Sequence, residues 1–242
     1  MSLPGQVESA TPSVPGFDCD TILSASLARA FYQQGYKFCF RYLSREAQSG
    51  QDLTELEATD ILNSGLAVMP VQHVRRQGWS PDQNLGQQDG QNAAQNSQFV
   101  GFPAGVSVWC DLEGVNAAAH APDVIDYCEA WYEAVLAAGY LPGLYVGACA
   151  QLTGQQLSDL SFQHYWRSQS RVPEIPNRGY QLVQLFPSIE INGVSVDIDI
   201  AQDDKKNGQA QWLRLEVGFK QQQILSAARK SGHVGRSYKA KR

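Results

Sequence analysis

The sequence predicts an α/β fold, specifically a (β/α)8 TIM-like barrel with short or missing helices in its C-terminal third. Short apolar runs alternate with amphipathic stretches, which implies parallel strands joined by helical crossovers. The chain has 242 residues, of which 43% are hydrophobic and 18% charged, and this length and balance suit one large domain. Polar and acidic side chains follow several of the apolar runs, where barrels of this type place their chemistry.

The first half of the chain gives the clearest alternation. After a short strand at 17–19, Leu27, Ala30 and Phe31 recur at helical spacing within 24–34, and Gly35 ends that helix. The elements expected next are a strand at 38–42, a helix at 54–63, a strand at 66–71, a long polar connection at 73–89 and a helix at 90–100.

In the second half the strands remain visible while the helices shorten. A strand at 106–111 is followed by a strong helix at 122–138, which Pro122 opens and Gly139 closes. The remaining elements are a strand at 144–146, a short helix at 155–160, and strands at 164–166, 181–185 and 194–198. Eight strands would close a barrel. An open Rossmann-type sheet is the alternative, but no Gly-x-Gly-x-x-Gly follows the first strand.

Charge divides the chain into a body and a tail. Residues 205–242 hold ten Lys and Arg against one acidic residue, although the whole chain has a net charge of −5. We therefore expect an N-terminal extension at 1–13, the barrel at 14–204 and a basic C-terminal extension at 205–242. The tail could contact an anionic surface or be a frayed terminus. The acidic body and the lack of a recognised motif argue against nucleic-acid binding.

No apolar stretch approaches the roughly 20 residues that cross a bilayer, so we expect no membrane span. Residues 1–15 lack the basic start and apolar segment of a secretory signal. We expect synthesis in the cytoplasm, and export by a non-classical route if the target is the cell wall.

Cysteine and histidine give no sign of a metal or cofactor. None of the five cysteines forms a Cys-x-x-Cys pair, and the four histidines lack His-x-x-x-His spacing. We expect buried structural thiols, no cofactor and no metal site, although crowded carboxylates would leave room for a hard cation. An amidase or peptidase is disfavoured because no Cys/His or Ser/His pairing stands out.

The triplet Asp111-Leu112-Glu113 is the strongest chemical signal. It ends an apolar run, and in an extended strand its two carboxylates share one face, roughly 6–7 Å apart. Such a pair can divide acid and base duties. The alternative is a solvated strand end that leads into a turn at Gly114.

Other polar and aromatic residues are predicted to converge with Asp111 and Glu113 at one open end of the barrel, which we call its mouth. They lie at or just past the ends of the expected strands: Asp18, Arg41, Gln72, Asp111, Glu113, Tyr145, Trp166, Gln184 and Asp197. Several carboxylates would then meet in one pocket.

An ordered set of short motifs resembles a known family. The motifs are Gly16-Phe17-Asp18, Phe38-Cys39-Phe40-Arg41-Tyr42, Gly65 to Pro70, Gly101-Phe102-Pro103, Asp111-Leu112-Glu113, Gly139 to Tyr145, Gln184 and Val196-Asp197-Ile198-Asp199. Together they resemble a bacterial glycoside-hydrolase-like domain of unknown function over about residues 14–204. The sequence is similar, more distantly, to the family-25 lysozymes, which are barrel muramidases that cut peptidoglycan.

The lysozyme resemblance implies a role for each acid. Glu113 would be the general acid, and Asp111 would orient the N-acetyl group or act on the anomeric carbon. Asp18 and Asp197 would tune charge and bind hydroxyls. The expected substrate-binding residues are Arg41, Tyr42, Gln72, Tyr145, Trp166, Gln184 and Asp199, and the aromatic ones among them could instead be core residues.

The sequence also departs from the lysozyme pattern. Cys19-Asp20 replaces the usual pair after the first aspartate, and the Gln/Asn-rich stretch 72–98 has no lysozyme equivalent. Activity does not follow from fold alone. The expected function is a glycoside hydrolase acting on peptidoglycan, and the alternative is a catalytically silent glycan-binding domain on the same fold.

Overall fold

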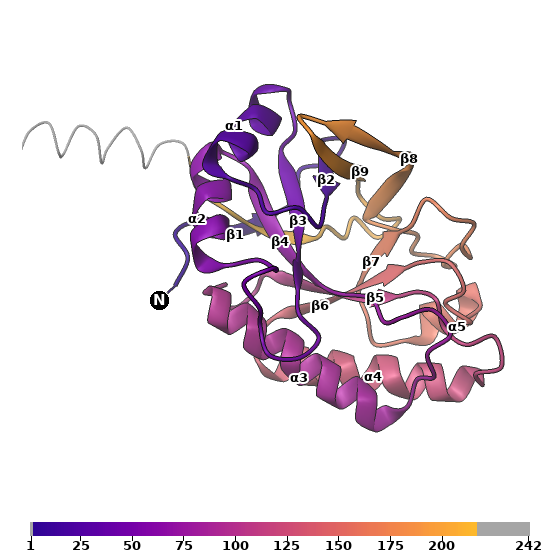
Figure 1. Cartoon of the computed structure of the whole chain (residues 1–242). Helices are drawn as coiled ribbons and strands as arrows, with labels where there is room; N and C mark the ends of the chain where they lie inside the picture. Colours follow the sequence, from indigo (N-terminus) through magenta and orange to yellow (C-terminus); the bar gives the residue numbers. More distant parts are fainter. Residues whose placement is uncertain (1, 217–242) are drawn as a thin grey trace, which may run out of the picture.

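The computed structural model describes residues 2–216, which form ten strands and five helices around a single barrel (Figure 1). The elements, in chain order, are β1 Gln6–Ser9, β2 Pro15–Asp18, α1 Ala25–Gln33, β3 Phe38–Leu43, α2 Glu55–Ser64, β4 Ala67–Gln72, α3 Gln83–Val100, β5 Ser107–Leu112, α4 Ala121–Ala137, β6 Leu141–Val146, α5 Gly154–Asp159, β7 His164–Arg167, β8 Leu182–Ile191, β9 Val194–Ala201 and β10 Gln211–Arg214.

Eight of the strands close the barrel in the order β4-β3-β2-β9-β8-β7-β6-β5, and the pairing of Val71 with Trp109 joins β4 to β5. Helices alternate with the strands as far as α5, which has six residues. Between β7 and β9 the described chain has no helix. The predicted TIM-like α/β barrel with a helix-poor C-terminal third is therefore confirmed.

One strand runs against the expected direction. The alternation predicted parallel strands throughout, but β9 pairs antiparallel with both β8 and β2. The cause is the turn between β8 and β9, where Asn192 and Gly193 have φ of 55° and 76°. Two consecutive positive φ angles are typical of the tight Asn-Gly hairpin, which returns the chain at once and leaves no room for a crossover helix.

Helix α3 is longer than predicted. The segment 73–89 was expected to be a polar connection, but the helix begins at Gln83, where the Asp82 side chain accepts a hydrogen bond from the Leu85 amide at 2.9 Å. Gly86 and Gly90 bring this helix against the backbone of α4, at positions where any side chain would overlap Tyr127 or Trp131. This part of α3 packs through close backbone contact and has no apolar stripe, so hydrophobic periodicity does not reveal it.

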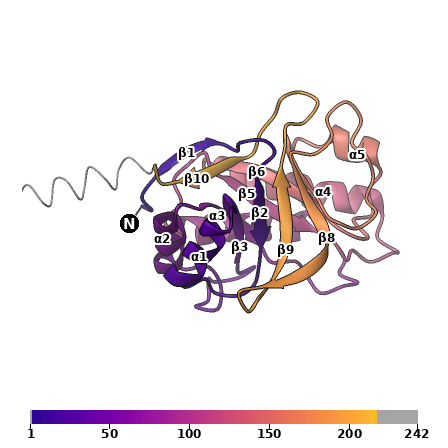
Figure 2. The ribbon, with the colours of Figure 1, turned by 90° about the horizontal axis from the view of Figure 1, so that it is seen from above.

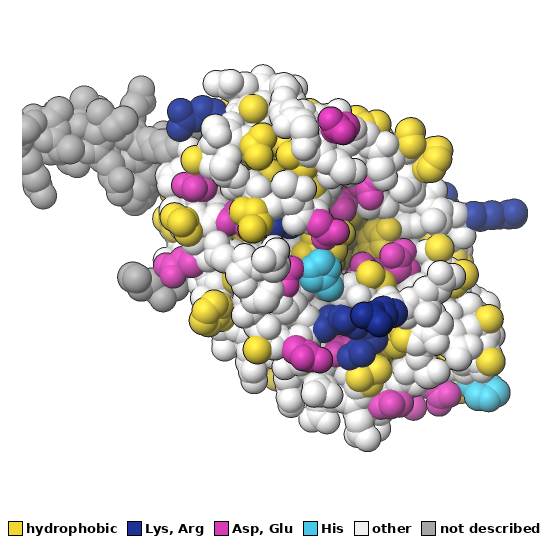
Figure 3. Space-filling model, in the orientation of Figure 1, with side chains coloured by type: hydrophobic (Ala, Val, Ile, Leu, Met, Phe, Trp, Pro, Cys, Tyr) yellow, Lys and Arg dark blue, Asp and Glu magenta, His cyan; other side chains and the backbone are white. Residues whose placement is uncertain are grey.

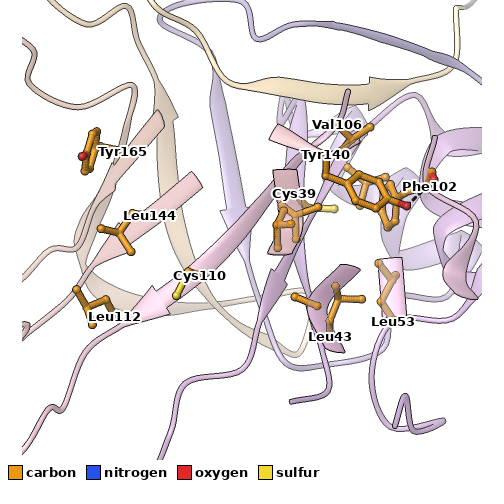
Figure 4. Packing of buried hydrophobic residues seen from close by; sticks show 14 of the residues in the cluster. Cys39, Leu43, Leu53, Phe102, Val106, Cys110, Leu112, Tyr140, Leu144 and Tyr165 are labelled. Carbon is orange, nitrogen blue, oxygen red and sulfur yellow. Dashed lines mark hydrogen bonds between the residues drawn. The ribbon is translucent and has the colours of Figure 1, made fainter. Parts of the chain in front are cut away.

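The hydrophobic residues form two layers, one inside the barrel and one between the barrel and the helices. The inner layer is aromatic, with Phe40 stacked on Trp166 at a ring separation of 4.0 Å and Trp109 beside them. The outer layer is larger and includes Cys39, Leu144 and other strand residues that alternate with the inner ones (Figure 4). This alternation decides which side chains of each strand can reach the mouth.

The ribbon of β1 and β10 lies at the end of the barrel where the parallel strands begin (Figure 2). These strands fall in the segments expected as extensions, and Trp212 of β10 is buried beside Phe38 inside the barrel. The basic residues Lys220, Arg229, Lys230, Arg236, Lys239, Lys241 and Arg242 lie outside the described residues. No helix within 2–216 is both long and apolar enough to cross a membrane.

Arg41 belongs to the layer between barrel and helices. It lies on β3 between the inward Phe40 and Tyr42, so its side chain points outward and meets Glu57 of α2 at 2.7 Å. Both side chains are almost completely buried, and Arg41 also donates a hydrogen bond to the Cys19 carbonyl oxygen. This pair ties α2 to β2 and β3, next to the residues that form the mouth.

We expect Glu57→Gln to lower the free energy of unfolding by about 3 kcal/mol, because it leaves the buried guanidinium charge without a counter-charge. Urea denaturation measures this loss. Glu55→Gln, on the same helix but partly exposed, is the matched control and should change stability by less than about 0.5 kcal/mol. Equal effects of the two changes would contradict the argument.

Candidate active site

The carboxylates of β2 and β9 face each other at the mouth of the barrel. Asp18 is the last residue of β2 and lies opposite Asp197 in the antiparallel register, while Gly16 lies opposite Asp199. The reversed strand thus places Asp197 at the level of the mouth and Asp199 one layer deeper. Asp197 was expected at the end of a strand, but it occupies the middle of β9.

A hydrogen-bond network holds Asp18. Its Oδ1 accepts from the Tyr42 hydroxyl at 3.1 Å, and its Oδ2 accepts from Gln184 Nε2 at 2.8 Å. The same Gln184 amide reaches Asp197 at 3.3 Å, and its carbonyl oxygen accepts from the Tyr145 hydroxyl at 3.0 Å. Residues of β3, β8, β9 and β6 therefore take part in the network that holds this one carboxylate of β2.

Asp199 is completely buried beneath this network. Its Oδ1 accepts from Trp166 Nε1 at 2.8 Å, which assigns Trp166 to the floor of the site rather than to its wall. Its Oδ2 has no hydrogen-bond partner among residues 2–216. A proton held by Asp199 would let this oxygen donate to Asp18, and such a bond favours the neutral form of Asp199 and the charged form of Asp18.

Asp111 of β5 and Glu113, which follows the end of that strand, reach the mouth on the strand face that Trp109 occupies inside the barrel. Asp111 Oδ1 is buried and has no hydrogen-bond partner among the described residues. Glu113 lies against Gly147, where a β-carbon would overlap the Glu113 side chain. Gly147 is thus required for space, since it gives Glu113 room beside the end of β6.

Two hollows open at this mouth. One, of about 200 Å³, is lined by Asp18, Asp20, Tyr42, Ser188 and Asp197, among others. The other, of about 440 Å³, lies between Glu113 and the segment 74–77. In the space-filling view, acidic side chains rim a hollow on this face, with basic side chains and a histidine beside it (Figure 3).

Burial raises the proton affinity of these acids. It raises the pKa of Asp18 to about 7, with Asp197 adding to the shift, and raises that of Asp111 well above its ordinary value, with Glu113 and Asp18 adding to it. The pKa values of Glu113 and Asp199 are raised in the same direction, and burial is again the largest cause. Carboxyls that share a desolvated site cannot all ionise at neutral pH, so the cluster retains protons.

Two of the predicted substrate-binding residues lie on the outer face of the barrel. Arg41 is buried against Glu57, and Gln72 points outward between β4 and the helices, where it donates to the Asp89 carbonyl oxygen and accepts from Trp131 Nε1. Both occupy outward positions of their strands. Expecting them at the site was wrong, because lying near the end of a strand does not fix which face a side chain takes.

Several residues at the mouth were not predicted. His73 stacks on Tyr42 with ring centroids 4.6 Å apart and forms a hydrogen bond with Asp52 at 2.7 Å. Ser188 donates a hydrogen bond to Asp197, and the nearby Phe186 is 80% exposed. The segment 73–82 carried no recognisable motif, whereas the Asn-Gly turn could have revealed the hairpin that brings Ser188 and Phe186 to the site.

The described residues contain no group of three or more His, Cys, Asp or Glu side chains that could hold a metal ion. The polar groups that surround the acids are instead donors of the kind that bind carboxylates: the Tyr42 hydroxyl, the Gln184 amide and the Ser188 hydroxyl. The arrangement suits proton transfer and hydrogen bonding to a polyhydroxylated ligand.

Known structures share this fold at low sequence identity. The Tat-secreted protein Rv2525c of Mycobacterium tuberculosis, in complex with L-tartrate, is 15% identical, with a TM-score of 0.62 over 81% of this chain and 98% of that one. A bacterial lysozyme from Streptomyces coelicolor is 14% identical, with a TM-score of 0.55 over 83% and 95%. The autolysin LytC of Streptococcus pneumoniae, in complex with a synthetic peptidoglycan ligand, is 11% identical, with a TM-score of 0.56 over 78% and 46%.

No curated protein sequence matches the chain. The family model described as "Rv2525c-like, glycoside hydrolase-like domain" matches residues 29–204, which is more than half of the sequence and includes the acids of β5 and β9. The chain therefore belongs to the Rv2525c-like, glycoside hydrolase-like domain family.

Proposed function

We propose that this protein is a glycoside hydrolase of the lysozyme type that acts on peptidoglycan, with Glu113 as the general acid. The observation that carries the proposal is the convergence of Asp18, Asp111, Glu113 and Asp197 on one open mouth, where burial raises the pKa values of the first three. The shared fold of a lysozyme and of an autolysin solved with a peptidoglycan ligand supports this choice of polymer.

Glu113 has the properties that a general acid needs. It is only partly buried and lines the larger hollow, so a glycosidic oxygen can reach it. Burial and the nearby Asp197 charge raise its pKa, which keeps a proton on the group at a higher pH than an exposed glutamate would. The Ala148 backbone amide opposes that shift, because it favours the charged form of the carboxyl group.

Asp111, on the inner face of β5, is suited to act on the same sugar residue whose glycosidic oxygen Glu113 would protonate. The residue is partly exposed, and its carboxyl group can accept a hydrogen bond from an N-acetyl N–H group of the substrate. In this role Asp111 orients the acetamido group for attack on the anomeric carbon, while Asp18 and Asp197 hold hydroxyl groups of the substrate. Tyr42 and the exposed Phe186 offer aromatic faces on which sugar rings can stack.

Export of such an enzyme would have to bring it to the wall. The Tat-secreted relative of similar fold supports an extracytoplasmic site of action for this chain as well.

The catalytically silent alternative, a glycan-binding domain on this barrel, would use the same mouth and the same aromatic faces. The two functions differ in whether the proton on Glu113 is ever transferred.

Glu113→Gln should reduce muropeptide release from insoluble peptidoglycan by about a thousandfold, because an amide cannot donate the proton that the leaving oxygen needs. Binding, measured by sedimentation with the same polymer, should persist. Glu133→Gln, an exposed change on α4, is the control and should leave release unchanged. If wild type binds the polymer without releasing reducing ends, the silent binding domain is the correct function.

Gly147→Ala should lower the rate of release at least about tenfold, because the new methyl group occupies the space of the Glu113 side chain and displaces its carboxyl group. Steady-state kinetics with soluble glycan strands measures the loss. Gly50→Ala, at a position with open space around it, is the matched control. An unchanged rate in a folded Gly147→Ala protein would show that the carboxyl position is not critical.

A site that retains protons should also cost stability at neutral pH. The folded-state pKa of Asp18 is raised from 3.8 to about 7, so between these two pH values the folded protein binds more protons than the unfolded chain does. The free energy of unfolding therefore falls as the pH rises from 3.8 to about 7. Asp199→Asn should reduce this fall, since its amide can keep the acceptor for Trp166 and donate permanently to Asp18.

We therefore expect Asp199→Asn to be more stable than wild type at pH 8 by about 1 kcal/mol or more, and to lose that advantage at pH 4. Urea unfolding across this pH range is the measurement, with Asp126→Asn on the exposed face of α4 as the control. A parallel pH dependence in wild type and Asp199→Asn would contradict the shared proton.

A further inference from the structure

The hollow beside Glu113 has a basic wall that the hydrolysis of a neutral sugar does not explain. It is lined by Val74, Arg75, Arg76, Gln77, Glu113, Gly114, Ala148 and Cys149. Basic side chains gather next to the acidic rim on this face of the molecule (Figure 3). A mouth that carries at least four carboxyl groups would repel an anionic polymer, so cations at its edge bear directly on which glycans can enter.

The two arginines are not equivalent. Arg75 is held by Asp89, with Nε at 2.8 Å from Oδ2 and Nη2 at 2.6 Å from Oδ1, and this bidentate pair neutralises its charge. Tyr127 donates a further hydrogen bond to the same carboxylate at 2.9 Å, which fixes the pair against α4. Arg75 is therefore a rigid, charge-compensated part of the wall.

Arg76 has no such partner. Its side chain is exposed and makes no hydrogen bond or ion pair with any described residue, so its guanidinium group retains its full charge at the hollow. The loop that carries it is anchored to the loop after β5, since Gly78 donates to the Gly114 carbonyl oxygen at 2.6 Å and Trp79 Nε1 donates to the Glu113 carbonyl oxygen at 2.8 Å. The backbone of Arg76 is thus held in a fixed position relative to the backbone of Glu113.

We propose that Arg76 forms a subsite for a carboxylate carried by the sugar bound next to Glu113, and so selects acidic glycan strands over neutral ones. This inference rests on the proposed function and names the substrate class of that same site. A guanidinium group pairs with a carboxylate through two parallel hydrogen bonds, and Gln77 adds an amide to the same wall. In peptidoglycan the carboxylate can be that of the lactyl ether or that of a stem peptide.

The test uses the full chain with Glu113→Gln, so that binding is measured without turnover. The probes are peptide-free glycan strands with free lactyl carboxylates, the same strands after carbodiimide amidation of those carboxylates, and strands that retain their stem peptides. We expect Arg76→Gln to weaken binding of the peptide-free acidic strands about tenfold, and to leave binding of the amidated strands unchanged. Arg76→Lys should retain most of the affinity.

Arg29→Gln, at an exposed arginine on α1 that lines neither hollow, is the matched control and should change none of the affinities. Greater sensitivity of the peptide-bearing strands than of the peptide-free strands would assign the carboxylate to the stem. Equal loss for acidic and amidated strands, no loss for either, or no binding of the acidic strands by the Glu113→Gln protein would overturn the subsite.

The outcome is separable from that of the proposed hydrolysis. If wild type releases no reducing ends but Arg76→Gln still removes the preference for acidic strands, the hydrolase fails and the subsite stands. If release depends on Glu113 and the preference is insensitive to Arg76, the subsite fails and the hydrolase stands.

Discussion

Burial of carboxyl groups above an aromatic barrel interior is the constraint on which the site depends. Phe40, Trp109 and Trp166 fill the space beneath the mouth and exclude water from the inner side of Asp111 and Asp199. Carboxyls in such a place bind protons more tightly, and where hydroxyl and amide donors reach them the charged form recovers part of the lost solvation. Asp18 has both effects, since burial opposes the hydrogen bonds from Tyr42 and Gln184.

The surrounding elements serve mainly to fix those carboxyl groups. The Arg41 and Glu57 pair holds α2 against the strands that carry Asp18 and Tyr42, although neither charge reaches the mouth. Gly147 yields space for Glu113 where any side chain would intrude. The loop after β4 is joined to the loop after β5 through Gly78 and Trp79, so that the basic wall and the proposed general acid keep a fixed relation.

Reversal of β9 decides how many acids share the mouth. With β9 antiparallel to β2, Asp197 lies opposite Asp18 and Asp199 lies one layer lower, beside Gly16. The hairpin that causes the reversal also extends beyond the barrel and presents Ser188 and the exposed Phe186 near Asp197. One tight turn thus shapes one side of the proposed cleft.

The sequence by itself determined the barrel, its helix-poor end and the strand positions of most acids, because hydrophobic periodicity and strand-end residues are local properties. It also predicted Asp111 and Glu113 on one face, since alternation along an extended strand is local too. Only the tertiary structure decided that Arg41 and Gln72 point outward, that α3 begins at Gln83 and that β9 is reversed. Those features depend on which face a neighbour covers and on contacts between segments far apart in the chain, and such contacts leave no periodic signal in either segment alone.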